Sequence, residues 1–174
     1  MNIVNLFPTP VCVKYLKPLS KLILQKILKH KTKPDWQFNV LQSQNTYILE
    51  EKFLKNLKKQ INYTGEKQIH YPHFHPNSII SGVYYINADP KLDFILFKKN
   101  VYDQIKIYPS KFNVHNSDTW WIPAATNKLI LFPSSLMHEV GNVKKTYGKR
   151  ISLAFNVFVK GDLGSKQTLT ELKI

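Results

Sequence analysis

The residues best suited to chemistry are three histidines within the segment His-Tyr-Pro-His-Phe-His-Pro-Asn, at positions 70–77. Side chains two residues apart in an extended strand face the same side, so His73 and His75 should point together. Their imidazoles would then be close enough to share one metal ion. His70 should face the other way unless Pro72 bends the strand. Alone, such a pair is more often a surface or hydrogen-bonded pair than a metal site.

Two further candidate parts lie later in the chain. The apolar run 129–132 leads through a Pro-Ser-Ser turn to His138. Arg150 and Ser152 open the last long apolar run, and the same spacing places them on one face. A guanidinium fork beside a hydroxyl suits a carboxylate. Two close histidines, one distant histidine and a carboxylate clamp describe an open metal site, and imidazole ligands with free positions suit Fe(II).

The elements that must position these residues differ between the two parts of the chain. A Pro-rich opening and loose alternation over 1–16 favour an edge strand. Ser20 can cap a helix that runs to about residue 31, and a second amphipathic helix is expected over about 47–61. Both helices should pack against a sheet.

After residue 62 the pattern changes to short runs rich in Ile, Val, Tyr, Phe and Trp, separated by turn residues. Many short strands favour a mainly β fold, and eight candidates fit a jelly roll, or double-stranded β-helix. The expected strands are 67–73, 79–87, 92–98, 104–108, 118–122, 128–132, 137–143 and 150–159. We therefore expect a single domain over 1–174. It would comprise the N-terminal strand and supporting helices (1–61), the jelly-roll core (62–160) and a C-terminal tail (161–174).

Composition limits the partners. The chain has 24 lysines but only one arginine, and its net charge is +14. Nucleic acid is a conceivable partner but not the favoured one, because the lysines are dispersed and phosphate-binding surfaces usually include arginine. One cysteine excludes a disulfide framework and a Cys-based zinc site. The lack of a long apolar run and of a signal-like N-terminus favours the cytoplasm, or the host cytoplasm for a phage-encoded protein, with no membrane partner.

The order of these parts resembles the Fe(II)- and 2-oxoglutarate-dependent oxygenases, specifically their prolyl-hydroxylase branch. The segment 73–87 is similar to that branch's His-x-Asp strand and the Tyr-Tyr-Leu-Asn strand after it. His138-Glu-Val, followed twelve residues later by Arg150-x-Ser, resembles the distal histidine and the oxoglutarate-binding arginine. The chain is most similar to a small group of oxygenases of bacteria and phages. These share Leu-Phe-Pro-Thr-Pro near the start, Leu-Phe-Pro-Ser before the distal histidine and Gly-Asp-Leu-Gly-Ser near the end.

This resemblance implies an enzyme with Fe(II), 2-oxoglutarate and O2. It would decarboxylate 2-oxoglutarate oxidatively to succinate and CO2 and hydroxylate a C–H bond of a peptidyl residue or a small molecule. His73 and His138 would bind Fe(II). Arg150 would bind the distal carboxylate of 2-oxoglutarate, assisted by Ser152, Tyr85 and Tyr63.

One position departs from the family pattern. Where the second ligand is usually Asp or Glu, this chain has His75, and we expect it to be the third ligand. Three neutral imidazoles leave the site one unit more positive, which should favour the dianionic cosubstrate and weaken the hold on Fe(II). Glu139 should face away from His138 in a strand, and Glu66 and Asp89 remain alternatives from loops.

The substrate side is less specific. Tyr71, Trp120 and Trp121 lie near the strands expected to border the pocket, although aromatic residues at strand spacing also fill jelly-roll cores. Two other functions stay open. One is a jelly-roll binding module that is non-catalytic or turns over without a substrate. The other is an oxygenase that modifies nucleic acid.

Overall fold

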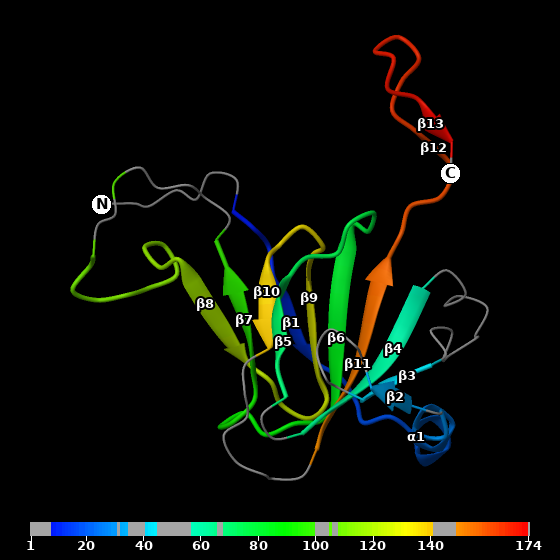
Figure 1. Cartoon of the computed structure of the whole chain (residues 1–174), viewed down its shortest axis with the longest axis vertical. Coiled ribbons are helices and arrows are strands. Elements are labelled where there is room, and N and C mark those ends of the chain that lie inside the picture. Colours follow the sequence, from blue (N-terminus) through cyan, green and yellow to red (C-terminus); the bar gives the residue numbers. More distant parts are fainter. Residues whose placement is uncertain are drawn as a thin grey trace.

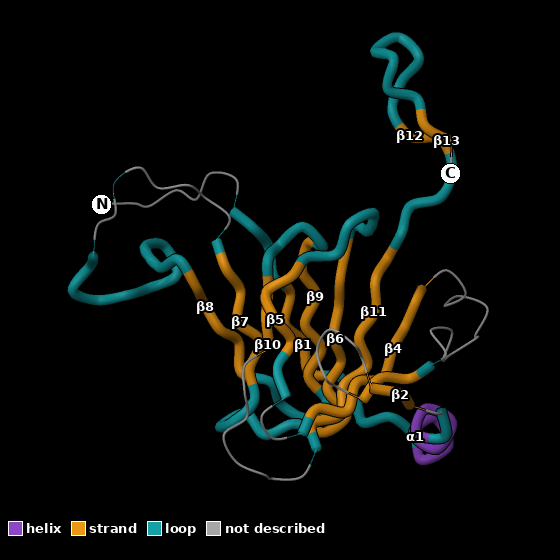
Figure 2. The backbone as a smooth tube through the Cα atoms, viewed as in Figure 1, coloured by secondary structure: helices purple, strands orange, loops and turns teal. Residues whose placement is uncertain are grey.

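In the computed structural model, two antiparallel sheets form the body of the part of the chain that is described (Figure 1). The structure describes residues 8–30, 32–34, 41–44, 57–65, 68–99, 105, 108–140 and 149–173, without the side chains of 57 and 58. Within these residues nearly all regular structure is β-strand (Figure 2). The expected mainly β jelly-roll fold is confirmed.

The larger sheet has the strand order β1-β9-β6-β11-β4-β3-β2. Its strands are β1 (Cys12–Tyr15), β9 (Lys128–Pro133), β6 (Ile80–Asn87), β11 (Arg150–Val157), β4 (Leu57–Thr64), β3 (Leu41–Ser43) and β2 (Thr32–Pro34). The expected N-terminal edge strand is therefore confirmed as β1. The long central strand β11 pairs with β4 on one side and with β6 on the other, which brings residues from three distant segments together.

The smaller sheet has the order β5-β10-β7-β8. Its strands are β5 (His70–His73), β10 (His138–Val140), β7 (Phe94–Lys98) and β8 (Thr119–Pro123). Seven of the eight expected strands of the core are found. Of the eighth, 104–108, only Ile105 and Tyr108 lie within the described residues, and neither is in a strand.

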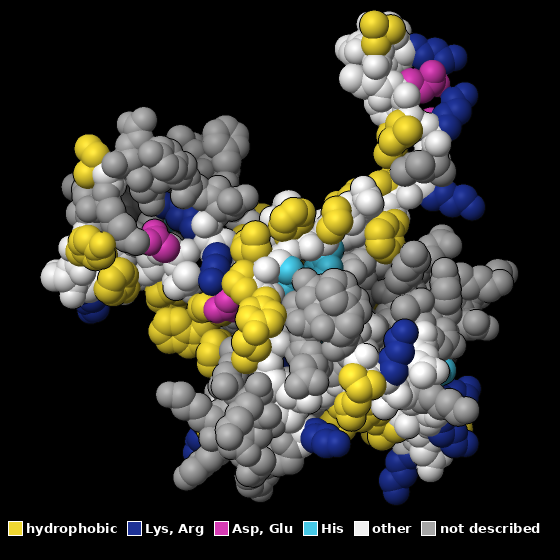
Figure 3. Space-filling view, viewed as in Figure 1, with side chains coloured by type: hydrophobic (Ala, Val, Ile, Leu, Met, Phe, Trp, Pro, Cys, Tyr) yellow, Lys and Arg dark blue, Asp and Glu magenta, His cyan; other side chains and the backbone are white. Residues whose placement is uncertain are grey.

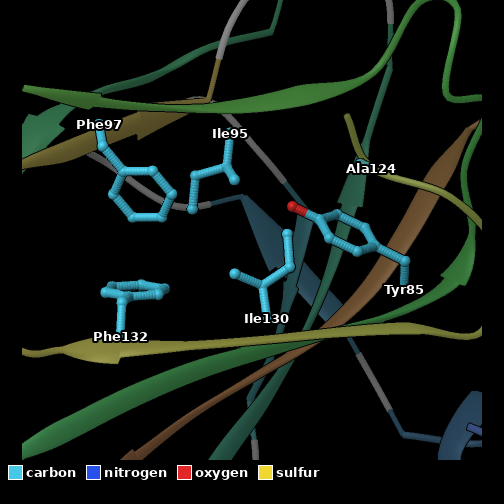
Figure 4. Packing of buried hydrophobic residues seen from close by; sticks show 6 residues of the cluster. All are labelled: Tyr85, Ile95, Phe97, Ala124, Ile130 and Phe132. Atoms are coloured by element: carbon cyan, nitrogen blue, oxygen red, sulfur yellow. The ribbon is translucent and has the colours of Figure 1, made fainter. Parts of the chain in front are cut away.

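The core lies between the sheets and follows from the alternation of side chains along the strands. Ile95 and Phe97 on β7 face Ile130 and Phe132 on β9 (Figure 4). All four side chains are at most 7% exposed. Burial of such apolar surface is the main force that holds the two sheets together.

The other face of the larger sheet is covered by α1 (Lys21–Leu28), the first expected helix. Its N-terminus is capped by Ser20, whose Oγ accepts a hydrogen bond from the Ile23 N–H at 3.3 Å. Ile27 is fully buried and packs in a second cluster with Ile61, Tyr84 and Leu153. The helix therefore stabilises the sheet from its outer side.

The second expected helix, 47–61, is wrong over residues 57–61, which belong to β4. Residues 47–56 of that expected helix lie outside the described residues. Eight residues of β4 pair with β11, and Ile61 faces the helix while Asn62 faces the other sheet. The apolar spacing in this segment also fits a helix, and pairing with the neighbouring strand decides between the two.

Residues beyond β11 leave the two sheets (Figure 1). They form a small hairpin of β12 (Asp162–Leu163) and β13 (Leu172–Lys173), which pair with each other. Within the described residues no helix is long and apolar enough to cross a membrane.

Candidate metal and carboxylate site

A cavity of about 480 Å³ opens between the two sheets. One side is lined by imidazoles from the smaller sheet. The opposite side is lined by polar side chains of β4, β6 and β11 from the larger sheet. In the space-filling view, histidine side chains reach the surface beside a band of apolar side chains (Figure 3). Residues that line the cavity and enter the argument below are His73, His75, His138, Tyr85, Arg150, Ser152, Asn62, Thr64, Ser81 and Asn156.

The three expected histidines converge at this cavity. His73 ends β5 and is the register partner of His138 on β10, so strand pairing brings these two together. His75 follows β5, and its backbone N–H donates to Ser134 O at 2.9 Å. The ring centroids lie 4.3 to 5.1 Å apart, and one nitrogen from each ring lies within 4.8 Å of the others. Three imidazoles this close together could hold one metal ion.

The three imidazoles are neutral at neutral pH. Burial, with a smaller contribution from the neighbouring His73, lowers the pKa of His75 to about 4 and that of His138 to about 3. Burial also lowers the pKa of His73. Neutral imidazole is the form that binds a metal.

Backbone carbonyls orient two of the rings. His73 Nδ1 donates to Tyr71 O at 2.7 Å, and His138 Nδ1 donates to Leu136 O at 2.9 Å. A carbonyl only accepts hydrogen bonds, so Nδ1 carries the proton in both rings and Nε2 is free to act as ligand. This donor set fits a divalent transition metal such as Fe(II).

Hydroxyl groups hold the turn that carries His75. Ser134 is fully buried, and its Oγ contacts the Oγ atoms of Ser78 and Ser81, the latter at 2.9 Å. Ser81 Oγ also donates to Asn156 Oδ1 at 2.7 Å. The Pro-Ser-Ser turn before His138 thus supports the His75 segment as well, a role that the sequence analysis did not predict.

The expected carboxylate clamp lies on the larger sheet. Ser152 on β11 is the register partner of Tyr85 on β6, and Arg150 lies on the same face as Ser152. These three side chains are buried. Burial raises the pKa of Tyr85 to about 12, so its hydroxyl stays protonated and can donate. It points into the space between the sheets (Figure 4).

An acid that the sequence analysis missed lies against the clamp. Asp93 precedes β7, and its Oδ1 lies 3.1 Å from Arg150 Nη1. The two side chains are 7% and 3% exposed. An acid inside the otherwise apolar run 92–98 was the available signal, since a buried carboxylate needs a partner. The extra positive charge expected at the site is therefore offset by Asp93.

Tyr63 does not join the clamp. It packs in the outer cluster beneath α1, whereas its neighbours Asn62 and Thr64 line the cavity. Alternation of side chains along β4 explains the difference, because Tyr63 points to the opposite face from Asn62 and Thr64. Asn62 Oδ1 and Thr64 Oγ1 are buried without a hydrogen-bond partner among the described residues. Thr64 is the register partner of Arg150.

The expected substrate-side aromatics do not line the cavity within the described part of the chain. Tyr71 and Trp121 are more than half exposed, and Trp120 is 37% exposed. The two tryptophans stack on each other on β8, the outer strand of the smaller sheet. Phe74, between two of the histidines, lines the cavity and is 53% exposed.

Neither of the alternative acids that the structure describes joins the histidines. Glu139 Oε2 pairs with Lys98 Nζ at 3.0 Å. Asp89 Oδ1 accepts from the Lys91 N–H at 2.9 Å in the turn before β7. Glu66 lies outside the described residues. His70, in contrast, also lines the cavity, with its ring centroid 6.4 Å from that of His73.

The sequence matches a known family model. Residues 61–156, more than half of the chain, match the model of the family described as "Putative 2OG-Fe(II) oxygenase". The matched region includes the three histidines, Arg150 and Asp93. No curated protein matches the sequence.

Solved structures with a similar fold include a prolyl-4-hydroxylase from Pseudomonas putida. It has 11% sequence identity and a TM-score of 0.58, over 88% of this chain and 94% of that one. A prolyl hydroxylase from Trichoplax adhaerens, in complex with a peptide fragment of hypoxia inducible factor, has 11% identity and a TM-score of 0.53, over 85% and 82%. HygX from Streptomyces hygroscopicus, with nickel, 2-oxoglutarate and hygromycin B bound, has 11% identity and a TM-score of 0.54, over 85% and 82%.

Proposed function

Because the chain belongs to the family of 2OG-Fe(II) oxygenases, we propose that it is a dioxygenase that uses Fe(II), 2-oxoglutarate and O2. The reaction is the oxidative decarboxylation of 2-oxoglutarate to succinate and CO2, coupled to hydroxylation of a C–H bond. The proposal rests on one observation. Three neutral imidazoles and a buried arginine, contributed by opposite sheets, line the same cavity.

His73, His75 and His138 would hold Fe(II) through imidazole nitrogens. Bound iron supplies the redox chemistry with O2 that amino-acid side chains cannot perform. The carbonyls of Tyr71 and Leu136 fix the orientation of two of the rings. Ligands held in this way need little reorganisation when the metal binds.

Arg150 would bind the distal carboxylate of 2-oxoglutarate through the N–H groups that Asp93 leaves available. Ser152 and the protonated Tyr85 hydroxyl are placed to donate to the same carboxylate. Thr64, whose hydroxyl is buried beside Arg150, replaces Tyr63 as the candidate donor from β4. Charge-assisted hydrogen bonds in a buried site are strong, so Arg150 should contribute most of the discrimination for a dicarboxylate.

The substrate would approach the exposed mouth of the cavity, where Phe74 offers an apolar contact. A peptidyl substrate is the first candidate, because the Trichoplax neighbour is a prolyl hydroxylase in complex with a peptide. A small molecule is the second candidate, since the Streptomyces neighbour has hygromycin B bound.

The test is a ligand titration under anaerobic conditions. Fe(II) with 2-oxoglutarate should produce a visible metal-to-ligand charge-transfer band with the wild-type protein. Arg150→Ala should weaken 2-oxoglutarate binding by about 100-fold, as expected when one partner of a buried charged pair is removed. Pyruvate has the same 2-oxo acid group but no distal carboxylate, so its binding should change little.

A folding control is needed because Arg150→Ala leaves Asp93 buried and unpaired. The double variant Arg150→Ala/Asp93→Ala removes both charges and should retain the fold by circular dichroism while it still binds 2-oxoglutarate poorly. No charge-transfer band from the wild-type protein, together with no succinate formed in air, would contradict the proposal.

A second measurement separates an active enzyme from a non-catalytic binding module. The wild-type protein should form succinate from 2-oxoglutarate in air. If succinate appears only in His75→Asp, the natural triad does not support turnover and the protein is a binding module.

A further inference from the structure

We propose that Asp93 is a positioning residue that sets how tightly the site binds the distal carboxylate of 2-oxoglutarate. It would do so by holding one edge of the Arg150 guanidinium and offsetting part of its charge. This inference rests on the proposed function, and it adds a residue outside both the metal ligands and the expected clamp.

Asp93 is held in place independently of Arg150. Its Oδ2 accepts a hydrogen bond from the Asp89 N–H at 2.9 Å, and its own N–H donates to Asp89 O at 2.7 Å. Its carbonyl accepts from the Ala124 N–H at 2.9 Å. The turn before β7 therefore presents Oδ1 to Arg150 with support that does not depend on Arg150.

The contact with Arg150 occupies one side of the guanidinium. A single Asp93 oxygen meets a single nitrogen, Nη1, at 3.1 Å. A guanidinium has five N–H donors in a planar fork, so the remaining donors can meet a ligand carboxylate. Ser152 lies on the same strand as Arg150, Thr64 and Tyr85 lie on the two neighbouring strands, and all three line the same cavity.

The charges indicate why an acid belongs here. A metal shell of two histidines and a carboxylate, combined with one arginine, has no net protein charge. Three neutral histidines with an isolated Arg150 would have a charge of plus one. The pair of Asp93 and Arg150 returns the charge of these groups to zero, so their negative charge lies beside Arg150 instead of at the metal. Lys59, a buried cation that also lines the cavity, is common to both cases and does not change the comparison.

This location has a consequence for affinity. A carboxylate bound to Arg150 lies near the Asp93 carboxylate, and like charges in a buried site repel each other. Asp93→Asn keeps the shape and an oxygen that can accept from Nη1, but it removes the charge. We expect the variant to bind 2-oxoglutarate about tenfold more tightly. This is a modest change in affinity for the removal of one like charge at close range in a protein.

The experiment is an anaerobic titration of the Fe(II)-loaded full-length chain, followed by the charge-transfer band. Wild type, Asp93→Asn and Asp93→Ala are each titrated with 2-oxoglutarate and with pyruvate. Asp162→Asn is the matched control, because it removes one carboxylate from the exposed hairpin far from the cavity. We expect tighter 2-oxoglutarate binding in both Asp93 variants, and unchanged pyruvate binding in all of them.

Unchanged or weaker 2-oxoglutarate binding by the folded Asp93 variants overturns the inference, and so does an equal change for pyruvate. These results leave the proposed function intact as long as the wild-type protein binds 2-oxoglutarate more tightly than pyruvate. If the wild-type protein does not prefer 2-oxoglutarate, the proposed clamp fails and the inference fails with it.

A second measurement covers a variant that folds poorly. Asp93→Asn leaves the Arg150 charge buried without its counter-charge, so a ligand carboxylate should take that place. 2-Oxoglutarate with Mn(II) should raise the melting temperature of Asp93→Asn more than that of the wild-type protein, while pyruvate raises both equally. Equal shifts with 2-oxoglutarate overturn the inference.

Discussion

At the scale of single residues, the candidate metal ligands are neutral, and the charged side chains are different residues. The metal candidates His73, His75 and His138 are neutral donors, whereas Arg150, which lines the opposite side of the cavity, is charged and pairs with Asp93. Burial is the main cause in both places. It keeps the imidazoles unprotonated, and it makes a buried arginine depend on a counter-charge.

The neutral imidazoles predict how stability depends on pH. In the unfolded chain His75 and His138 titrate near the ordinary value of about 6.5, but folding lowers their pKa values to about 4 and about 3. As pH falls below about 6.5, the unfolded chain binds more protons than the folded protein. The free energy of unfolding of the metal-free protein should therefore decrease between pH 7.5 and pH 5, as measured by urea unfolding.

His138→Asn should reduce this pH dependence, because one buried imidazole no longer has to be kept neutral. His115→Asn is the control, since His115 is exposed on a turn away from the site. A free energy of unfolding that stays constant from pH 7.5 to pH 5 would contradict the assignment of buried, neutral imidazoles.

At the scale of elements, three neighbouring strands of the larger sheet pack closely in the middle of β6. Gly82 is the register partner of Phe155 on β11 and of Leu131 on β9. A Cβ at this position would overlap the Phe155 ring and lie 2.7 Å from Leu131 Cδ2. Gly82→Ala should destabilise the protein by about 1–3 kcal/mol, the usual cost of an overpacked site. Chemical denaturation measures this change.

Gly65→Ala is the matched control, because the added Cβ would lie at an ordinary 3.5 Å from the Gln68 side chain. Replacing the Phe155 ring with a smaller side chain, in the double variant Gly82→Ala/Phe155→Leu, should recover part of the lost stability. Equal stability of Gly82→Ala and Gly65→Ala would contradict the close approach of β6, β9 and β11 at Gly82.

At the scale of the whole molecule, the C-terminal hairpin lies apart from the two sheets (Figure 2). Its strands β12 and β13 pair with each other. Removal of residues 161–174 should change the free energy of unfolding by less than about 0.5 kcal/mol, as for other changes away from the core. Ile27→Ala is the contrasting variant, and it should cost about 2–5 kcal/mol because Ile27 is fully buried. A large loss on truncation would show that the hairpin stabilises the body.

The distribution of charge also belongs to this scale. The lysines of the described residues that are visible in Figure 3 lie at separate places on that face. Two of the described lysines, Lys59 and Lys128, are buried. These two therefore do not contribute to a basic surface.

Much of the site was predictable from local patterns. The spacing of His73 and His75, the turn before His138 and the pair Arg150 and Ser152 each depend on a few neighbouring residues. The larger error, a helix over 57–61, arose where the spacing of apolar residues fits both a helix and a strand. Tyr63 was assigned by family resemblance alone, which does not determine the face of β4 to which a side chain points; the register with the partner strand does.

The sequence by itself determined which donors are available: neutral imidazoles from two distant segments, one arginine and the short apolar runs of a jelly roll. Only the tertiary structure decided that His138 meets His73 across β10 and β5, and that Asp93 meets Arg150 from a separate sheet. These pairings join residues more than fifty positions apart. The contacts form because polar groups buried between the two sheets need hydrogen-bond or charge partners. Local spacing along the sequence does not determine which partner each group meets.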